Sequence, residues 1–96
     1  MTQGGWVYVM ANRYRGTIYI GVTSSLAHRV QQHRDGNGSR FARSYGCKKL
    51  VYAEQHATIV EAIAREKHLK KWNRDWKIRL IEELNPEWLD RYNDLA

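Results

Sequence analysis

Apolar and polar residues alternate near the start of the chain, and this pattern predicts a β-hairpin. Residues 6–11 carry aromatic and β-branched side chains that suit a pleated sheet. Residues 12–16 are polar and end in glycine, as a hairpin connection does. Residues 17–22 form the second strand, and the two-residue period of strands lets Tyr8 and Tyr19 point to the same side of the sheet. We therefore expect two phenol groups close together at the mouth of a cleft.

The next third of the chain predicts a short helix and a third strand. Residues 23–25 carry hydroxyl groups that can cap a helix over residues 26–34. Turn residues break the chain at 35–39, and a basic loop with two aromatic residues follows over 40–46. Residues 48–54 have the composition of a strand.

In the last forty residues the apolar positions repeat at roughly the 3.6-residue period of helices, which predicts an all-helical segment. Thr58 can cap a helix that runs to residue 71. Residues 73–84 form a second helix or continue the first as one bent element. Asn85, Pro86 and Glu87 have the composition of a further helix start, with apolar residues following on one side.

The order of these elements defines the fold class. Two strands, a helix, a strand and then helices predict an α+β fold, in which a small three-stranded antiparallel sheet is flanked by helices. Ninety-six residues suit a single domain over residues 1–96.

The charge of the chain favours a polyanionic partner. The formal net charge is +6 and the isoelectric point is about 9.7. A small basic domain with 43% hydrophobic residues is a folded protein, and nucleic acid ranks ahead of a membrane surface as its partner. Basic composition for solubility alone is the competing explanation.

Cysteine content and the N-terminal sequence exclude several classes of protein. Cys47 is the only cysteine, so an internal disulfide or a multi-cysteine zinc site is impossible, and we expect it to be a small, partly buried residue. The first residues lack the basic-then-apolar pattern of a signal peptide, and no apolar run approaches the ~20 residues of a membrane span. We expect a cytoplasmic protein that does not enter a membrane.

Glu66 is the most informative single position for chemistry. It projects within roughly 20° of the centre of the apolar stripe of its helix. A carboxylate on that side needs a partner, because an unpaired buried charge is costly, and a divalent cation or an arginine is the usual one. A surface pair with Lys70 is the alternative, but it would leave the carboxylate on the wrong face. The stripe consists of Ile59, Val60, Ala62, Ile63 and Leu69.

Arg29 and His33 lie four residues apart, so they are neighbours on one face of their helix. The guanidinium fork of arginine matches phosphate oxygens, and histidine can move a proton near neutral pH. Both residues flank an apolar stripe at its edge, which suits groups that reach into a cleft. A solvated basic face, extended by His28 and Arg34, explains them equally well.

Tyr8, Tyr19 and Gly21 have ordinary explanations as well. Tyrosine is common in strands and usually packs there. Glycine within a strand marks close approach of a ligand or another backbone, or else a bulge or the end of the strand.

Basic residues outside these positions could track a nucleic acid backbone, while Phe41 or Tyr45 stacks on a base. One glutamate with one histidine in a supporting role implies a single, weakly held ion with oxygen ligands, Mg²⁺ or Mn²⁺, rather than zinc. The predicted nucleic-acid-binding residues are Arg13, Arg15, Arg40, Arg43, Lys48 and Lys49.

Taken together, these motifs resemble the GIY-YIG nuclease superfamily, most closely its small, single-domain bacterial branch of mostly uncharacterised proteins. The likeness rests on the tripeptides of residues 6–8 and 19–21, in order with Arg29, His33 and the Arg-Glu-Lys run of residues 65–67. The chain departs from the name motif, because Trp-Val-Tyr stands where Gly-Ile-Tyr is usual, but the tyrosine is retained.

The resemblance implies hydrolysis of a DNA phosphodiester with one metal ion, in DNA repair or recombination. Tyr8 would be the general base for water, and Tyr19 would help to position that water. Arg29 would stabilise charge on the phosphoryl group, and His33 would assist proton transfer or hold Tyr8. Glu66 would bind the metal. A phenol is a poor base at its ordinary pKa of about 10, so we expect nearby cations to lower the pKa of Tyr8.

The resemblance also implies a supporting asparagine, for which Asn85 is the candidate, with Asn73 and Asn93 left open. Family members often carry a separate DNA-binding domain, so a protein partner could supply target specificity here, and RNA is a second possible substrate. A nucleic-acid-binding module with weak or no catalysis is the alternative function. A protein-interaction domain that uses the tryptophans of residues 72–88 is a third.

Overall fold

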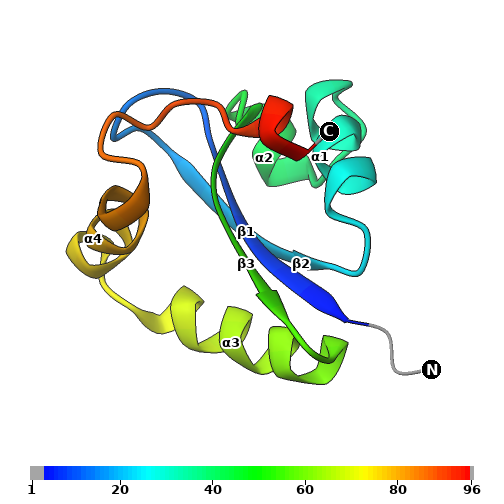
Figure 1. The fold of residues 1–96 in the computed structure, drawn as a ribbon. Coiled ribbons are helices and arrows are strands. Elements are labelled where there is room, and N and C mark those ends of the chain that lie inside the picture. The colour runs from blue at the N-terminus through cyan, green and yellow to red at the C-terminus, as the bar shows by residue number, and fades with distance from the viewer. Residues whose placement is uncertain (1–3, 96) are drawn as a thin grey trace.

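The computed structural model describes residues 4–95 as a three-stranded sheet between two groups of helices (Figure 1). Sequence and structure agree on the α+β class, and the predicted strands and the helix over residues 26–34 are confirmed within two residues at each end. The elements are β1 (Gly5–Ala11), β2 (Ile18–Thr23), α1 (Leu26–Arg34), α2 (Arg40–Ser44), β3 (Lys49–His56), α3 (Ile59–Lys71), α4 (Arg74–Leu84) and the 3₁₀ helix η1 (Tyr92–Leu95).

β1 is the central strand of the sheet. It pairs antiparallel with β2 on one side and with β3 on the other, so the strand order is β2-β1-β3. In the β1–β2 ladder Tyr8 lies opposite Gly21, and Met10 lies opposite Tyr19. The register with β3 shifts between Val9 and Met10, where an extra residue of β3 is accommodated.

The sheet is covered on both faces, and each face has its own core. Alternate residues of β1 point to opposite sides, as the period of a strand requires. Val7 and Val9 pack with Ala62 and Leu69 of α3 and Ile81 of α4. Tyr8 and Met10 pack with α1 and α2 on the other face, through the buried residues Leu26, Val30 and Ala42. Figure 1 accordingly shows α3 below the sheet and α1 and α2 above it.

α3 and α4 are separate helices, each with its own N-cap. Thr58 accepts a hydrogen bond from the backbone N–H of Glu61 at 3.1 Å, as predicted, and Asn73 accepts one from Trp76 at 2.9 Å. The backbone of Trp72 is extended (ψ 151°), which breaks the helical path between them. The apolar stripe of α3 is narrower than predicted, because the Val60 side chain points outward and is 72% exposed.

Two local predictions are wrong because the N-termini of α2 and α1 are capped differently from what the sequence suggested. The predicted basic loop over residues 40–46 contains the helix α2, because Ser39 accepts a hydrogen bond from the backbone N–H of Ala42 and Ala42 is buried against the sheet. At α1 the N-cap residue is Ser25, but its hydroxyl makes no capping hydrogen bond. The hydroxyl of Thr23 instead accepts from the backbone N–H of Ser25.

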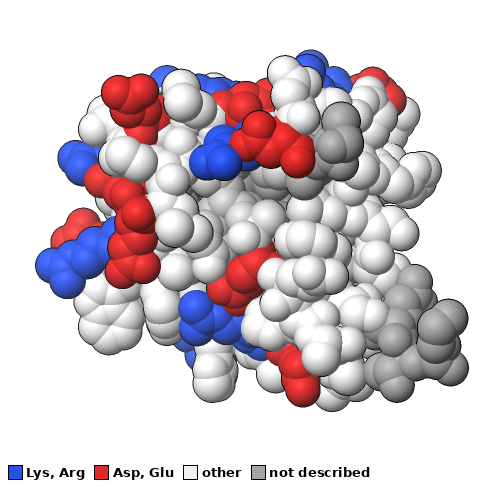
Figure 2. Space-filling model, in the orientation of Figure 1, with Lys and Arg blue, Asp and Glu red and all other residues white. Residues whose placement is uncertain are grey.

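Acidic and basic side chains are interspersed on the side of the molecule that carries β3 (Figure 2). The same view shows a hollow between them. It corresponds to a cavity of about 290 Å³ at the outer edge of β3, lined by Leu50, Val51, Tyr52, Ala53, Leu84, Asn85, Arg91 and Asp94.

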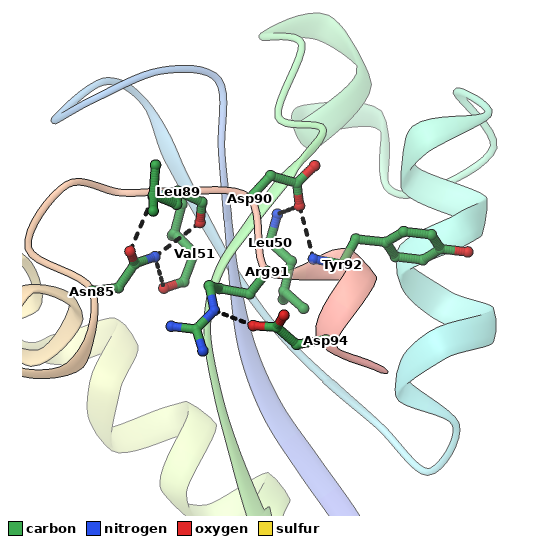
Figure 3. A network of polar contacts seen from close by, with 8 residues as sticks. All are labelled: Leu50, Val51, Asn85, Leu89, Asp90, Arg91, Tyr92 and Asp94. Atoms are coloured by element: carbon green, nitrogen blue, oxygen red, sulfur yellow. Dashed lines mark hydrogen bonds and ion pairs between the residues drawn. The ribbon is translucent and has the colours of Figure 1, made fainter. Parts of the chain in front are cut away.

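The predicted helix that starts at Asn85 is wrong. Asn85 ends α4 instead, and its side-chain amide donates to the carbonyl oxygens of Val51 and Leu89 at 3.0 and 2.9 Å (Figure 3). Its own side-chain oxygen accepts from the backbone N–H of Leu89 at 3.0 Å. Trp88 has φ +57° and a fully buried side chain. Burial of this indole and the bonds to β3 outweigh the local helix-start signal, since tertiary contacts override weak propensities.

Asp90 fixes the C-terminal segment further along β3. One carboxylate oxygen of Asp90 accepts from the backbone N–H groups of Leu50 and Tyr92 at 3.1 and 3.0 Å (Figure 3). The N–H of Arg91 donates to the carbonyl of Leu50 at 2.8 Å, so part of the outer edge of β3 is occupied by this segment. Within the part of the chain that is described, no helix is long and apolar enough to cross a membrane.

Candidate active site

The two hairpin tyrosines lie on the same face of the sheet, as predicted. Tyr8 comes from the central strand and Tyr19 from β2, and their ring centroids are 6.3 Å apart. Their placement differs from the prediction in depth: Tyr8 has no exposed surface, whereas Tyr19 is half-buried. The Tyr8 phenol is therefore enclosed beneath Tyr19 and α1 rather than at the mouth of a cleft.

Gly21 provides the space that the Tyr8 phenol occupies. A Cβ atom at position 21 would lie 2.5 Å from both Cζ and Oη of Tyr8, closer than any real contact. The register of β1 and β2 runs through Gly21 without a shift, and β2 continues to Thr23. A bulge or a strand end is therefore not the reason for this glycine; a close approach is, and the approaching group is the Tyr8 ring.

Arg29 and His33 of α1 both contact the Tyr8 hydroxyl. Nε2 of His33 lies 2.9 Å from Tyr8 Oη, and Nε of Arg29 donates to the same oxygen at 3.4 Å. Arg29 is held in place by a second hydrogen bond, from Nη1 to the side-chain oxygen of Gln32 at 3.0 Å. Against the effect of burial, the nearby phenol of Tyr19 contributes to raising the pKa of Arg29.

The buried His33 ring is confined on its other side by Gly38. A Cβ atom at position 38 would lie 2.2 Å from His33 Nδ1, so the loop backbone is in contact with the imidazole. Nδ1 is buried and has no hydrogen-bond partner among the described residues. Sequence analysis missed Gly38 and Gln32: a glycine in the 35–39 turn signals a turn, and a glutamine on a helix signals nothing specific.

Burial dominates the electrostatics of this cluster. It raises the pKa of the Tyr8 phenol to about 12, although the hydrogen bond from Arg29 acts in the opposite direction. Burial and then the positive charge of Arg29 lower the pKa of His33 to about 4. The predicted lowering of the Tyr8 pKa by cations is therefore wrong for the free protein, because loss of hydration outweighs the single neighbouring guanidinium. At neutral pH both groups are uncharged.

Glu66 reaches the region from α3, on the opposite face of the sheet. Its side chain is 14% exposed, and Oε2 lies 3.6 Å from Nζ of Lys70. The predicted inward position and the alternative pair with Lys70 are thus both present. Glu66 makes no hydrogen bond within residues 4–94, and no bond joins it to the Tyr8 cluster. Its negative charge is the last of the causes that raise the Tyr8 pKa, which places the carboxylate within electrostatic range of the phenol.

The surroundings of Glu66 fit a single hard cation. A largely enclosed carboxylate whose one partner is beyond hydrogen-bond distance has lone pairs left for an oxygen-liganded ion. Among the described residues there is no group of three or more His, Cys, Asp or Glu side chains that could hold a metal ion. Glu66 would therefore be the protein ligand, and water or substrate oxygens would complete the coordination shell.

The hydrogen bonds of Asn85 join it to backbone groups outside this cluster. Both N–H donors and the oxygen of its amide are used by the backbone of Val51 and Leu89, so its observed role is to hold the C-terminal segment on β3. Its assignment as the supporting asparagine stays a prediction. Asn73 caps α4, and Asn93 lies exposed in η1.

The predicted nucleic-acid-binding residues differ in exposure and in their partners within the protein. Arg15 makes two hydrogen bonds of 2.8 Å to Glu82, so its guanidinium has a partner within the protein, and its role in phosphate binding stays a prediction. Lys49 is half-buried at the start of β3. The remaining four are exposed and make no ion pair within residues 4–94: Arg13, Arg40, Arg43 and Lys48.

Cys47 and the tryptophans are mainly structural. Cys47 is fully buried in the core beside α1 and α2, more deeply than predicted. Trp88 is buried in the other core, where its indole N–H donates to Glu82 at 2.7 Å. Trp72 and Trp76 line a shallow groove on α4, and Trp76 is 52% exposed.

The fold is that of a small α+β domain with a cluster of polar side chains on one face of its sheet. Residues 4–79 match the GIY-YIG catalytic domain, so the chain belongs to the GIY-YIG family. It is 37% identical over 89 residues to a UPF0213 protein of Bacillus licheniformis, a match that covers 93% of this chain and 91% of that protein.

Other relatives of similar size support the assignment. A UPF0213 protein of Oceanobacillus iheyensis is 32% identical over 82 residues, which are 85% of this chain and 94% of that protein. A UPF0213 protein of Staphylococcus aureus is 35% identical over 68 residues, which are 71% of this chain and 83% of the relative. No solved structure matches the chain.

Proposed function

We propose that the protein is a divalent-metal-dependent endonuclease that hydrolyses phosphodiester bonds of DNA, in DNA repair or recombination. The observation that carries the proposal is the buried contact of Tyr8 with both His33 and Arg29, within a chain that belongs to a nuclease family. A phenol, an imidazole and a guanidinium that converge on one oxygen provide a proton path and an anion-binding group side by side.

Arg29 would bind the scissile phosphate. Its Nε contacts the Tyr8 hydroxyl and its Nη1 is held by Gln32, so two of its three nitrogens are positioned by the protein. Arginine keeps its charge at all relevant pH values, and its fork of donors suits phosphate oxygens. A phosphate held by Arg29 would thus lie next to the Tyr8 oxygen.

Proton transfer would run from water through Tyr8 to His33. As the water oxygen bonds to phosphorus and the bond from phosphorus to the leaving oxygen breaks, the water proton passes to Tyr8 Oη while the phenol proton passes to His33 Nε2. Solvent protonates the leaving oxygen. Tyr8, with a pKa of about 12, and His33, with a pKa of about 4, disfavour this transfer in the free protein. A phosphate anion at Arg29 would offset the smaller of the two causes that lower the His33 pKa, the charge of Arg29, and would so favour the transfer when substrate is bound.

Two further residues complete the proposed site. A divalent cation held by Glu66 would stabilise the developing charge on the leaving oxygen and lower the pKa of nearby hydroxyl groups. The Tyr19 ring stands beside the Tyr8 and His33 rings and near the Arg29 guanidinium, so its hydroxyl would orient the attacking water.

Plasmid nicking with Mg²⁺ or Mn²⁺ tests the proposal. We expect wild-type protein to nick, and Glu66→Gln to reduce the rate at least ~100-fold, because it removes the charge that would hold the cation. Glu83→Gln is the matched control, since Glu83 is an exposed carboxylate on α4 and its neutralisation should leave nicking unchanged. Unfolding transitions of the variants would show that each is folded.

A binding module without catalysis is the second candidate function, and the complete burial of Tyr8 is the observation that favours it. A general base must come within hydrogen-bond reach of its water, and the free protein offers little access. Folded wild-type protein that binds DNA in a salt-dependent manner but cuts no duplex, branched or single-stranded substrate would establish this alternative.

A further inference from the structure

Two exposed aromatic rings stand next to the candidate site on α2. Phe41 is 47% exposed and Tyr45 is 54% exposed, and their ring centroids are 4.8 Å apart. The buried residue of this helix is Ala42, which faces the sheet. Both rings therefore keep about half of their surface free, and neither is needed to fill the core.

The rings continue the aromatic residues of the site to the surface. The Phe41 centroid is 6.4 Å from Tyr19 with an interplanar angle of 30°, and Tyr19 is 6.3 Å from Tyr8. Tyr8, Tyr19, Phe41 and Tyr45 thus form an unbroken series of neighbouring rings. A nucleotide chain whose phosphate is bound at Arg29 and Tyr8 would bring its neighbouring bases to Phe41 and Tyr45.

The charge around α2 suits such a chain. Residues 26–49 contain six Lys or Arg and one acidic residue, so this quarter of the sequence holds five of the net six positive charges. Arg40 and Arg43 lie on α2 beside the two rings and are exposed. Exposed cations next to stacking rings are the usual composition of a surface that binds a single nucleic acid strand.

We propose that Phe41 and Tyr45 form a stacking platform for unpaired bases, so that the protein prefers DNA with a single-stranded segment next to the scissile phosphate. The inference rests on the proposed function for the position of that phosphate. Stacking on these rings requires a base whose face is free, and the bases within a continuous duplex already stack on each other. A strand without a complement, or the unpaired arm of a branched molecule, supplies such bases.

The aromatic groove at Trp72 and Trp76 provides the contrast within the same molecule. It is comparably exposed, since Trp76 is 52% exposed. It is lined by Glu83 as well as Arg79, and it lies on α4, which packs on the other face of the sheet. This groove has no excess of positive charge, and its rings are not neighbours of Tyr19. We therefore do not propose that it stacks on a nucleic acid base.

Equilibrium binding without metal tests the platform independently of cleavage. Fluorescence anisotropy would compare a short labelled single strand with the duplex of the same sequence. Phe41→Ala with Tyr45→Ala should weaken single-strand binding by roughly tenfold or more, as expected for loss of base stacking, and duplex binding by less than about twofold. Trp76→Ala should change neither affinity. Tyr45→Phe should retain the wild-type affinity, because it keeps the ring.

Strands that lack a single base locate the contact with the platform. In a series with one abasic nucleotide at successive positions, wild-type binding should be weakened most at one or two adjacent positions. In the double variant the same abasic strand should bind no worse than the intact strand, because base and rings are two halves of one contact and their effects do not add.

The opposite results would overturn the platform. Equal losses for strand and duplex, no loss in the double variant, or additive effects of variant and abasic site would each do so. A loss in Trp76→Ala as large as in the double variant would point to a different aromatic surface, for example one that binds protein. These outcomes are separate from the proposed function: absence of nicking by wild-type protein would end the nuclease proposal, and the binding results would still decide the platform.

Discussion

The two faces of the sheet differ in the net charge of the segments that cover them. Residues 26–49, which form α1, α2 and the connection to β3, hold five of the net six positive charges, whereas the rest of the chain has ten basic and nine acidic residues. On the α3 and α4 side, three cations are paired with carboxylates: Arg65 with Glu54, Lys70 with Glu66, and Arg15 with Glu82. The other cations of α3 and α4 have no ion pair within the described residues, but these two helices carry five carboxylates against seven cations. On the α1 and α2 side, Arg34 pairs with Asp90, but Arg40 and Arg43 have no ion pair within the described residues.

This difference indicates a division of roles. On one face carboxylates offset most of the positive charge, so that face contributes little net field. The excess of cations on the other face creates a positive field that attracts a polyanion. The candidate catalytic groups Tyr8, Arg29 and His33 belong to the basic face, and Glu66 is the one contribution from the other. The comparison can be tested by changing matched residues on the two faces.

Gly21 and Gly5 can each be replaced by alanine, and they lie on opposite faces of the sheet. We expect the nicking rates of these two variants to show the largest difference between the faces. Gly21→Ala places a Cβ 2.5 Å from the Tyr8 hydroxyl oxygen, so the phenol must move. We expect destabilisation of about 1–3 kcal/mol from overpacking. Displacement of a reacting group by about an ångström should also lower the nicking rate per folded molecule roughly 100-fold. Denaturant unfolding and plasmid nicking measure the two effects.

Gly5→Ala is the control for this prediction. Its Cβ would lie 2.8 Å from Ile59 and 2.9 Å from Ala62, so it strains the packing of α3 and should cost similar stability. It moves no member of the Tyr8, His33 and Arg29 cluster, so nicking by the folded fraction should fall far less. Equal losses of nicking in the two alanine variants would mean that the site is not concentrated on the α1 and α2 face.

The fold was predictable because its determinants are local. Strand alternation around Tyr8 and Tyr19, the caps Thr58 and Asn73 and the helical period of α1 each lie within a short window of sequence. Asn85 and Trp88 show where this fails. A cap residue, a proline and an acid predict a helix start. The amide of Asn85 instead bonds to the carbonyl of Val51 on β3, which is distant in sequence, and to two backbone groups of Leu89, which is not helical. A local pattern contains no information about those partners.

The same limit applies to the candidate site. The shared face of the tyrosines and the i, i+4 pair of Arg29 and His33 follow from element periods, so their convergence could be expected. The depth of Tyr8 could not, because burial depends on how α1 packs on the sheet. This depth reverses the expected direction of its pKa shift. The contact of Gly38 with His33 could not be predicted for the same reason, since it arises only when the 35–39 turn folds back on α1.

The pH dependence of stability tests the burial of His33 on the basic face. The groups around its ring are Tyr8 and Tyr19 of the sheet and Arg29 of its own helix. Its pKa falls from about 6.5 when unfolded to about 4 when folded, so between these values only the unfolded chain binds the proton. Stability is therefore complete above pH 6.5 and falls as the pH decreases toward 4, by up to about 3 kcal/mol from this residue.

Chemical denaturation between pH 4 and 7 measures this effect, with His33→Gln as the comparison. The variant should lose less stability over this range than wild type, and the difference isolates His33 from the carboxylates that also titrate. An NMR titration of the wild-type protein gives the His33 midpoint directly. A midpoint at or above the ordinary histidine value of about 6.5 would contradict the burial argument.

The smallest predicted effect compares two arginines by the salt dependence of DNA binding. The logarithm of the binding constant falls linearly with the logarithm of salt concentration, by about 0.7 to 0.9 per phosphate contact. Arg43 is exposed and unpaired within the described residues, so Arg43→Ala should reduce the slope by roughly one such contact. Arg15 is bound to Glu82 by two hydrogen bonds, so Arg15→Ala should leave the slope unchanged.

Anisotropy titrations at several salt concentrations would measure both slopes. The slope is the decisive quantity, because affinity at one salt concentration would also change if a variant altered the shape of the binding surface. A reduced slope in Arg15→Ala would mean that the ion pair with Glu82 opens on binding and that the DNA footprint extends past α2 to the β1–β2 connection. An unchanged slope in Arg43→Ala would mean that the charge excess of residues 26–49 does not contact phosphate at α2, and the functional contrast between the two faces would then rest on Arg29 alone.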